Sequence, residues 1–198
     1  MTTGSLRLRK GDVLLVVDVQ NDFLPGGALA VPGGDAVIPV LDTCAEKFDR
    51  CGLPVIASRD WHPGDHCSFR EQGGPWPVHC VAGTHGAELA ATLALPRGSA
   101  LVSKATERDR DAYSAFQGTD LGERLKHLHC RRLFIGGLAT DYCVRATALD
   151  ALAAGLEVIV LEDAVRAVDA HPGDGERALA ELASRGARLA RLDEVHGG

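Results

Sequence analysis

Short hydrophobic runs alternate with segments of helical spacing along most of the chain. Each run is nearly continuous in apolar residues, which is typical of strands that are covered on both faces. Each intervening segment repeats its apolar residues at a helical period and has Asp at or near its start. The expected strands are 13–19, 54–58, 100–103, 133–138 and 158–161, with a short last strand at 187–190. The expected helices are 35–50, 120–129, 141–154 and 174–185.

This order of elements predicts an α/β fold of three layers, α/β/α, in which helices cover both faces of a mostly parallel, open sheet. Strands that alternate with helices are joined by right-handed crossovers in such a sheet. A chain of 198 residues can bury a full core and still form a single domain, which we assign to residues 1–198. The segment at about 60–86 fits neither element and is rich in Pro, Gly, His and Trp. A loop of that length inside a compact domain is usually functional.

Charge and composition narrow the class of partner. The net charge of −6 and the absence of any Lys/Arg block argue against a nucleic-acid surface. No stretch approaches the roughly 20 apolar residues that span a bilayer, and the N-terminal residues lack the apolar core of a signal peptide. We therefore expect a cytoplasmic protein with a small-molecule partner and no membrane partner. Its six cysteines form no CxxC pair, and most are expected to be buried thiols.

Reactive side chains follow four of the expected strands. Ligands of open α/β sheets bind beyond the carboxyl ends of the strands, so polar residues at those ends are candidates for chemistry. The chain places Asp18, Asp60, Lys104 and Cys143 there. Because parallel strands end at one edge of a sheet, these four residues are expected to converge.

Cys143 lies near the start of the expected helix 141–154, just after a strand that ends in a glycine pair. Thr140 or Asp141 can cap this helix, and a thiol in a first helical turn has a lowered pKa. Such a thiol is suited to act as a nucleophile. The alternative is a small core residue, which is the role of most free cysteines.

Asp18 and Lys104 form the expected charge pair of this edge. A carboxylate at the end of a buried strand is costly unless it is paired, and Lys104 is the lysine that directly follows an expected strand. This lysine would support both a thiolate and a carboxylate, while Asp18 would move protons. The alternative for Asp18 is a carboxylate that caps a loop.

The long loop supplies a candidate metal site. Asp60 and His62 are two residues apart, so in extended backbone both side chains point to the same side and can reach one ion. His79 or His66 could complete the set. Two imidazoles and a carboxylate suit a divalent transition ion such as Zn, Fe or Mn.

Five stretches together resemble the nicotinamidase/pyrazinamidase branch of the isochorismatase-like cysteine hydrolases. They occur in the order of that family and are spread over most of the chain. One match of this kind would be weak, whereas five in register are specific. The stretches are Val17-Asp18-Val19-Gln20-Asn21-Asp22-Phe23, Ser58-Arg59-Asp60-Trp61-His62-Pro63, Gly74-Pro75-Trp76-Pro77-Val78-His79-Cys80-Val81, Ser103-Lys104-Ala105 and Gly137-Leu138-Ala139-Thr140-Asp141-Tyr142-Cys143-Val144.

The resemblance implies the isochorismatase-like hydrolase fold and a role for each residue at the edge. The implied catalytic triad is Asp18, Lys104 and Cys143. The implied metal ligands are Asp60, His62 and His79, with His66 either a fourth ligand or a neighbour that anchors a water. The implied oxyanion hole consists of the backbone N–H groups of Ala139 and Cys143, with a cis peptide bond before Ala139. The implied aromatic slot for a flat ring is lined by Phe23, Trp76 and Tyr113.

The reaction that the resemblance implies is hydrolysis of nicotinamide to nicotinate and ammonia, and of pyrazinamide to pyrazinoate. It would proceed through a thioester on Cys143 and belong to NAD salvage. It would need one divalent transition metal ion, with Zn as the first expectation and Fe or Mn as alternatives, and its partner would be an aryl amide. The resemblance leaves a homo-oligomer open.

Other functions fit parts of this pattern. Another isochorismatase-like hydrolase would act on a different small amide or vinyl ether, but its branch lacks the metal set. A metallohydrolase would attack with hydroxide and leave Cys143 incidental. A non-catalytic binding protein would require Asp18, Lys104 and Cys143 to share an edge by accident. At the loop itself, Cys67 and Cys80 allow a structural site of mixed Cys and His ligands.

Overall fold

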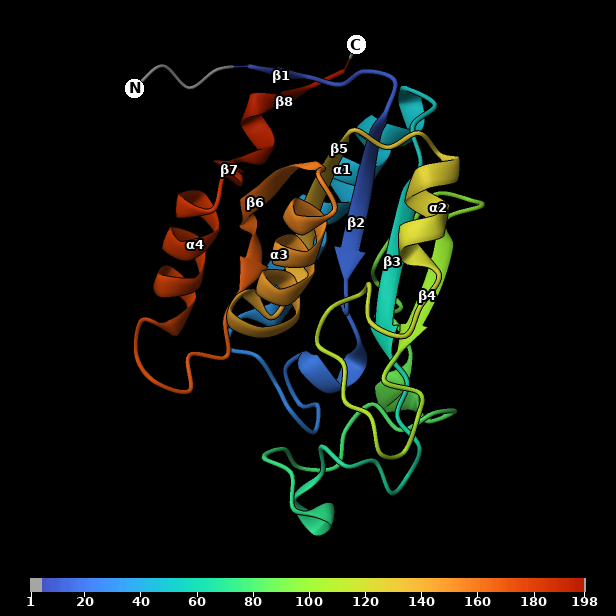
Figure 1. Cartoon of the computed structure of the whole chain (residues 1–198), viewed down its shortest axis with the longest axis vertical. Coiled ribbons are helices and arrows are strands. Elements are labelled where there is room, and N and C mark those ends of the chain that lie inside the picture. The colour runs from blue at the N-terminus through green and yellow to red at the C-terminus, as the bar shows by residue number, and fades with distance from the viewer. Residues whose placement is uncertain (1–4, 198) are drawn as a thin grey trace.

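A parallel sheet forms the centre of the molecule (Figure 1). The computed structural model describes residues 5–197. The strands of the sheet are β2 Asp12–Val17, β3 Val55–Asp60, β4 Ala100–Lys104, β5 Arg132–Leu138, β6 Glu157–Arg166 and β7 Arg188–Ala190. Their order is β4-β3-β2-β5-β6-β7, and every neighbouring pair is parallel. The expected parallel sheet is confirmed, including its short last strand.

Helices cover both faces of this sheet, which confirms the three-layer arrangement (Figure 1). Leu14 and Val16 of β2 lie in the core on one face, whereas Val13, Leu15 and Val17 lie in the core on the other. Alternate side chains of one strand thus enter two cores, which is why the strands read as continuous apolar runs. The helix on the first face is α1 Ile38–Arg50, and those on the second are α2 Leu121–His127, α3 Arg145–Ala153 and α4 Asp174–Ser184.

Several shorter elements complete the described chain. A separate two-stranded parallel sheet pairs β1 Leu6–Arg7 with β8 Val195–His196. Strands of two residues are too short to show a period, so no sequence pattern predicts them. The short helical turns are Asn21–Phe23, Gly34–Val37, Arg70–Gln72, His85–Ala87 and Leu192–Glu194, all of 3-10 type, and the π-helical turn Thr140–Val144. Among residues 5–197, no helix has the length and apolar character needed to cross a membrane.

The start of the expected helix 141–154 differs from the prediction. Its first residues form the π-helical turn, and α-helical geometry begins only with α3. Neither Thr140 nor Asp141 caps the turn with its side chain. The carboxylate of Asp141 instead accepts hydrogen bonds from the backbone N–H groups of Val168 and Asp169, at 3.0 and 2.9 Å. The capping prediction is wrong because partners distant in sequence occupy the carboxylate.

The turns after β2 and β5 lie side by side because the two strands approach closely at their ends. Gly137 has a φ angle of +126°, and a Cβ atom there would lie 2.0 Å from the carbonyl oxygen of Val17. Only glycine fits such an approach of two backbones. The turn that carries Cys143 is therefore placed next to the turn that carries Asp18.

The segment expected as a long loop, 60–86, is irregular apart from two 3-10 turns. It lies beyond the carboxyl ends of the strands, at the bottom of Figure 1. Together with the segments that follow β2 and β4, it covers the edge at which ligands of parallel sheets bind. The assignment of residues 1–198 to a single hydrolase domain stays a prediction.

Candidate active site

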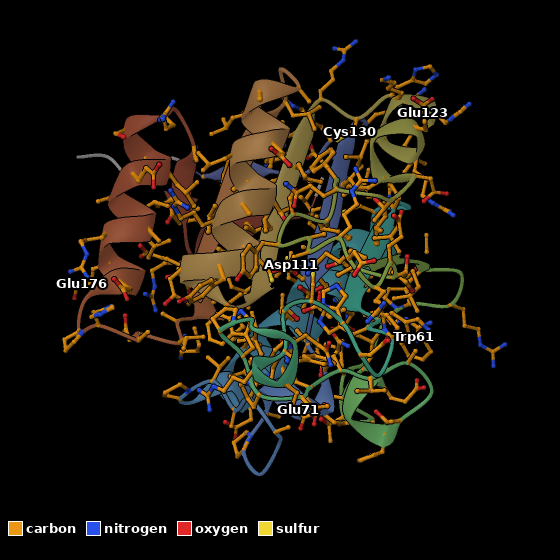
Figure 2. All side chains as sticks on the ribbon, turned by 60° about the horizontal axis from the view of Figure 1, so that its bottom comes forward. Trp61, Glu71, Asp111, Glu123, Cys130 and Glu176 are labelled. Carbon is orange, nitrogen blue, oxygen red and sulfur yellow. The ribbon has the colours of Figure 1, made fainter. Side chains whose placement is uncertain are left out.

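The carboxyl edge of the sheet gathers the four reactive residues that the sequence placed there. Asp18 directly follows β2, Asp60 ends β3 and Lys104 ends β4, while Cys143 lies in the π-helical turn after β5. Asp60 and Lys104 lie opposite each other in the ladder of β3 and β4. All four side chains are buried. Figure 2 turns this end of the molecule toward the viewer, with Trp61, Glu71 and Asp111 labelled in the surrounding loops.

Lys104 lies at the centre of the cluster. Its Nζ atom is 3.0 Å from Oδ2 of Asp18, 2.5 Å from Oδ1 of Asp60 and 3.4 Å from Sγ of Cys143. A further hydrogen bond of 3.2 Å runs to the carbonyl oxygen of Ala112. Burial opposes the charge, but the carboxylates of Asp18 and Asp60 outweigh burial and raise the pKa of Lys104. Asp18, Asp60 and Cys143 thus surround an ammonium ion, which supplies the positive charge between them.

Two of the acidic groups in this cluster, Asp18 and Cys143, have raised pKa values. Burial raises the pKa of Asp18, and although Lys104 lowers it, the net shift is upward. Burial also raises the pKa of Cys143 well above its ordinary value, against the opposing effect of Lys104. The prediction that a helix start lowers this pKa is therefore wrong, because desolvation dominates. A thiol of raised pKa needs a base to remove its proton, and the nearby Asp18 carboxylate, whose pKa is also raised, is suited to accept it.

Asp60, His62 and His79 form a buried group that could hold a metal ion. One ligand atom from each lies within 4.8 Å of the other two. The Nδ1 atom of His62 contacts the carbonyl oxygen of Ala105 at 3.2 Å, and that of His79 contacts the carbonyl oxygen of Pro77 at 2.8 Å. A carbonyl only accepts, so each Nδ1 carries the proton and each Nε2 keeps its lone pair for a ligand bond.

The donor set fits a transition ion. Two imidazoles and one carboxylate suit Zn, Fe or Mn better than Mg or Ca, which prefer oxygen ligands. The two oxygens of Asp60 face different partners, since Oδ1 contacts Lys104 while Oδ2 lies 3.7 Å from Nε2 of His62. Despite burial, the positive charge of Lys104 holds the pKa of Asp60 well below its usual range, so this carboxylate is ionised.

His66 lies beside this group without belonging to it. Its ring stacks on that of His62 with centroids 4.3 Å apart. Both of its nitrogens already have partners, since Nδ1 contacts Oγ of Ser68 at 2.7 Å and Nε2 contacts the carbonyl oxygen of Arg110 at 3.1 Å. The structure therefore does not place His66 as a fourth ligand.

The alternative of a mixed Cys and His site finds no support in the structure. Among the described residues, neither Cys67 nor Cys80 joins a group of three potential metal ligands. Burial raises the pKa of the Cys80 thiol far above its ordinary value, which disfavours the thiolate that metals bind.

A small cavity lies against Cys143. The predicted aromatic residues Phe23, Trp76 and Tyr113 line it. The indole N–H of Trp76 donates to the hydroxyl oxygen of Tyr113 at 2.9 Å, which joins the long loop to the segment after β4. A larger open depression lies at the other end of the sheet, beside α2, and contains none of the four reactive residues.

Four further residues line this cavity and were not predicted from the sequence. Tyr142 packs its ring edge-on against Trp76, with centroids 4.9 Å apart. Its position next to Cys143 is a signal that could have found it. The other three come from segments with no distinctive motif. They are Leu29, Val31 and Val168.

The backbone around Cys143 has the form that the resemblance implied. The peptide bond between Leu138 and Ala139 is cis. Ala139 and Cys143 both line the cavity, and the carbonyl oxygen of Ala139 accepts from the N–H groups of Tyr142 and Val144, each at 3.1 Å. An oxyanion hole made by the N–H groups of Ala139 and Cys143 stays a prediction.

The α/β fold and the four reactive residues at the carboxyl edge of its sheet together define a protein equipped for cysteine-dependent hydrolysis. The chain matches the model of the Isochorismatase domain over residues 12–194, and it belongs to that family. The family membership indicated by the five stretches is thereby confirmed, and with it the expected hydrolase fold.

Proteins of known activity or structure are similar to this chain. The nicotinamidase of Escherichia coli is 40% identical to this chain, over 90% of the chain and 94% of that enzyme. The crystal structure of the pyrazinamidase of Pyrococcus horikoshii in complex with zinc has a TM-score of 0.88 and 52% identity, and covers 91% of this chain and 99% of its own. The crystal structure of PnC1 from L. infantum in complex with nicotinate has a TM-score of 0.91 and 37% identity, and the match covers 98% of this chain and 100% of PnC1.

Proposed function

We propose that this chain is a metal-dependent nicotinamidase, which hydrolyses nicotinamide to nicotinate and ammonia and acts on pyrazinamide in the same way. The observation that carries the proposal is the position of Lys104, whose Nζ atom contacts Asp18, Asp60 and Cys143 at once. The Lys104 ammonium thus links Cys143 and its proton acceptor, Asp18, to the metal group of Asp60, His62 and His79. The similarity to a nicotinamidase and to a pyrazinamidase supports this choice of substrate.

The cavity suits a small aromatic amide. Aromatic side chains on its walls favour a flat ring by stacking and edge contacts. The cavity is bordered by His79 of the metal group and by Cys143. A ring that lies between these two residues has its carboxamide within reach of the thiol.

The first half of the reaction forms a thioester. The Cys143 thiol gives its proton to Asp18 as Sγ attacks the carboxamide carbon, and Lys104 stabilises the negative charge that passes from the carboxylate to the sulfur. The N–H groups of Ala139 and Cys143 would hold the resulting oxyanion, at about 3 kcal/mol per donor. Asp18 then passes the proton to the leaving nitrogen. The carbon–nitrogen bond breaks and ammonia departs.

The second half returns the cysteine. Asp18, which is again a carboxylate, takes a proton from water as the water oxygen attacks the thioester carbon. The carbon–sulfur bond breaks, Sγ recovers its proton from Asp18, and the acid leaves as nicotinate, with its remaining proton released to solvent. One carboxylate therefore serves as base and acid in turn.

Asp60, His62 and His79 would hold one divalent transition ion, with Zn as the first choice. When bound, such an ion supplies a Lewis acid and a fixed point that orients the substrate. The chain's own residues prepare that position, since Ala105 and Pro77 fix both imidazoles by their carbonyl groups. A zinc ion bound by a similar pyrazinamidase supports the choice of metal. We further propose that the enzyme acts in the cytoplasm in NAD salvage, as a single domain over residues 1–198.

Ammonia release from nicotinamide by the purified protein, before and after chelation, tests this proposal. We expect release that is lost on chelation and restored by Zn²⁺. No release from metal-loaded protein would reject the substrate, and release that survives thorough chelation would reject the role of the metal. The same assay with other small amides and vinyl ethers tests the alternative of a different isochorismatase-like hydrolase.

A further inference from the structure

We propose that Gln20 is a positioning residue that fixes Asp60 between the metal group and Lys104. The inference rests on the proposed function, because it concerns the ligand that the metal and the ammonium share. Gln20 does not line the cavity, so its side chain does not contact a substrate there.

The side-chain amide of Gln20 holds both polar groups of the Asp60 backbone. Its Nε2 donates to the carbonyl oxygen of Asp60 at 2.8 Å, and its Oε1 accepts from the N–H of Asp60 at 2.8 Å. A second Nε2 hydrogen bond of 2.9 Å runs to the carbonyl oxygen of Ala87. The residue is 0% exposed. Both donors of the amide and its acceptor are therefore used, which locks the orientation of the side chain.

The Gln20 side chain binds the Asp60 backbone where the neighbouring strand, β2, has already ended. The N–H of Asp18 still donates to the carbonyl oxygen of Ser58, at 3.2 Å. Asp18 then adopts a φ angle of +51°, and the chain leaves the sheet. Asp60, two residues further along β3, has no backbone of β2 beside it. The amide of Gln20 takes that place as a substitute peptide group.

The position of Asp60 has two consequences at once. Its Oδ1 contacts Lys104, and its Oδ2 faces Nε2 of His62. A shift of the backbone would disturb both contacts, since one carboxylate serves both the ammonium of Lys104 and the metal group. Partners that orient a ligand without touching the metal typically change metal affinity by about 10- to 100-fold. We expect loss of the Gln20 amide to lower metal affinity by a factor in that range.

Three variants test the proposal. Gln20→Met keeps the length of the side chain and removes all three hydrogen bonds. Gln20→Glu keeps an oxygen that can accept from the N–H of Asp60, but it loses the amide donors. Asn21→Ala is the matched control, because the Asn21 amide donates at 2.8 Å to the carbonyl oxygen of His85 in the same loop and does not touch Asp60.

The measurements are the Zn²⁺ affinity of the chelated protein, by competition with a chromophoric chelator, the melting temperature without metal, and kcat and KM for nicotinamide. We expect Gln20→Met to bind Zn²⁺ about 10- to 100-fold more weakly, with Gln20→Glu between it and the wild type. Asn21→Ala should stay within about twofold of the wild type. In Gln20→Met, kcat should fall more than KM changes, because the aromatic walls of the cavity are intact.

Two results with the variants would overturn the proposal. One is a Gln20→Met protein that melts cooperatively and binds Zn²⁺ within twofold of Asn21→Ala. The other is failure of both Gln20 variants to fold while Asn21→Ala folds, which would assign Gln20 to stability alone. A wild-type protein that binds Zn²⁺ but releases no ammonia rejects the proposed function and leaves the positioning role to the affinity data. A wild-type protein that does not bind Zn²⁺ rejects both.

Discussion

The Nζ atom of Lys104 lies 3.4 Å from the Sγ atom of Cys143, and both residues are buried. The same ammonium is 3.0 Å from the carboxylate of Asp18. It therefore stabilises both the group proposed to take the thiol proton and the thiolate that remains. Because Asp60 contacts this ammonium from the metal side, the proposed nucleophile and the metal group belong to one network of charges.

Lys104→Met should make Cys143 less reactive. Removal of the nearby positive charge raises the pKa of the thiol further, which reduces the thiolate fraction and slows alkylation. Alkylation by iodoacetamide, followed by mass spectrometry of the peptide that contains Cys143, measures the rate. The variant also leaves two carboxylates without their partner, so unfolding free energy should fall by about 3–5 kcal/mol. Lys126→Met, at an exposed helix position, is the control. Equal alkylation rates in all three proteins would contradict the proposed role.

Cys143→Ala should abolish turnover while it preserves the metal group. A residue that forms the covalent intermediate cannot be replaced by a methyl group, and losses of about 10⁶-fold occur in enzymes of this kind. Zn²⁺ content should be unchanged, since Cys143 is not in the group of Asp60, His62 and His79. Ammonia release and metal analysis on the same sample check both points. Retained turnover would favour attack by hydroxide and remove Cys143 from the mechanism.

His79→Gln and His66→Gln should separate a ligand from a neighbour. His79 offers a free Nε2 to the metal group, whereas both nitrogens of His66 are engaged with protein atoms. We expect His79→Gln to lose the metal on dialysis and His66→Gln to retain about one ion per chain. Elemental analysis after dialysis gives the result directly. Loss of metal in both variants would place His66 among the ligands after all.

Trp76→Phe and Tyr113→Phe should each weaken substrate binding without further loss in the double variant. Both remove the same hydrogen bond, from the indole N–H to the hydroxyl, and keep an aromatic ring in the cavity wall. A net hydrogen bond of about 1 kcal/mol corresponds to roughly a fivefold higher KM for nicotinamide. The double variant should match either single one, because the shared bond is lost only once. Fully additive effects would show that the two residues act separately.

Alkaline pH should destabilise the protein in part through Cys44. Burial raises the pKa of this thiol from 9.0 to about 12. Between these values the unfolded chain loses the proton and the folded chain keeps it, so stability falls as pH rises above about 9. At pH 10 the effect is on the order of 1 kcal/mol. Urea unfolding of the wild type and of Cys44→Ala at pH 8 and pH 10 isolates this contribution. The variant should lose less stability over that interval, and an equal loss would show that Cys44 does not contribute.

The sequence by itself determined the sheet and the identity of the reactive edge. Strands that are buried on both faces must be continuously apolar, so their positions were visible without a structure. Parallel strands must also end at one edge, which predicted that Asp18, Asp60, Lys104 and Cys143 would meet. Asp60 and His62 were paired by their spacing alone.

Only the tertiary structure decided how these residues are charged and held. Burial raises the pKa of the Cys143 thiol, and burial is a property of the whole fold. Both ring nitrogens of His66 have protein partners, the Ser68 hydroxyl and the Arg110 carbonyl group, which its position in the sequence did not reveal. Gln20 meets Asp60 across 40 residues of sequence. Such contacts join segments that no periodic pattern connects, since the packing of loops depends on all of their neighbours at once.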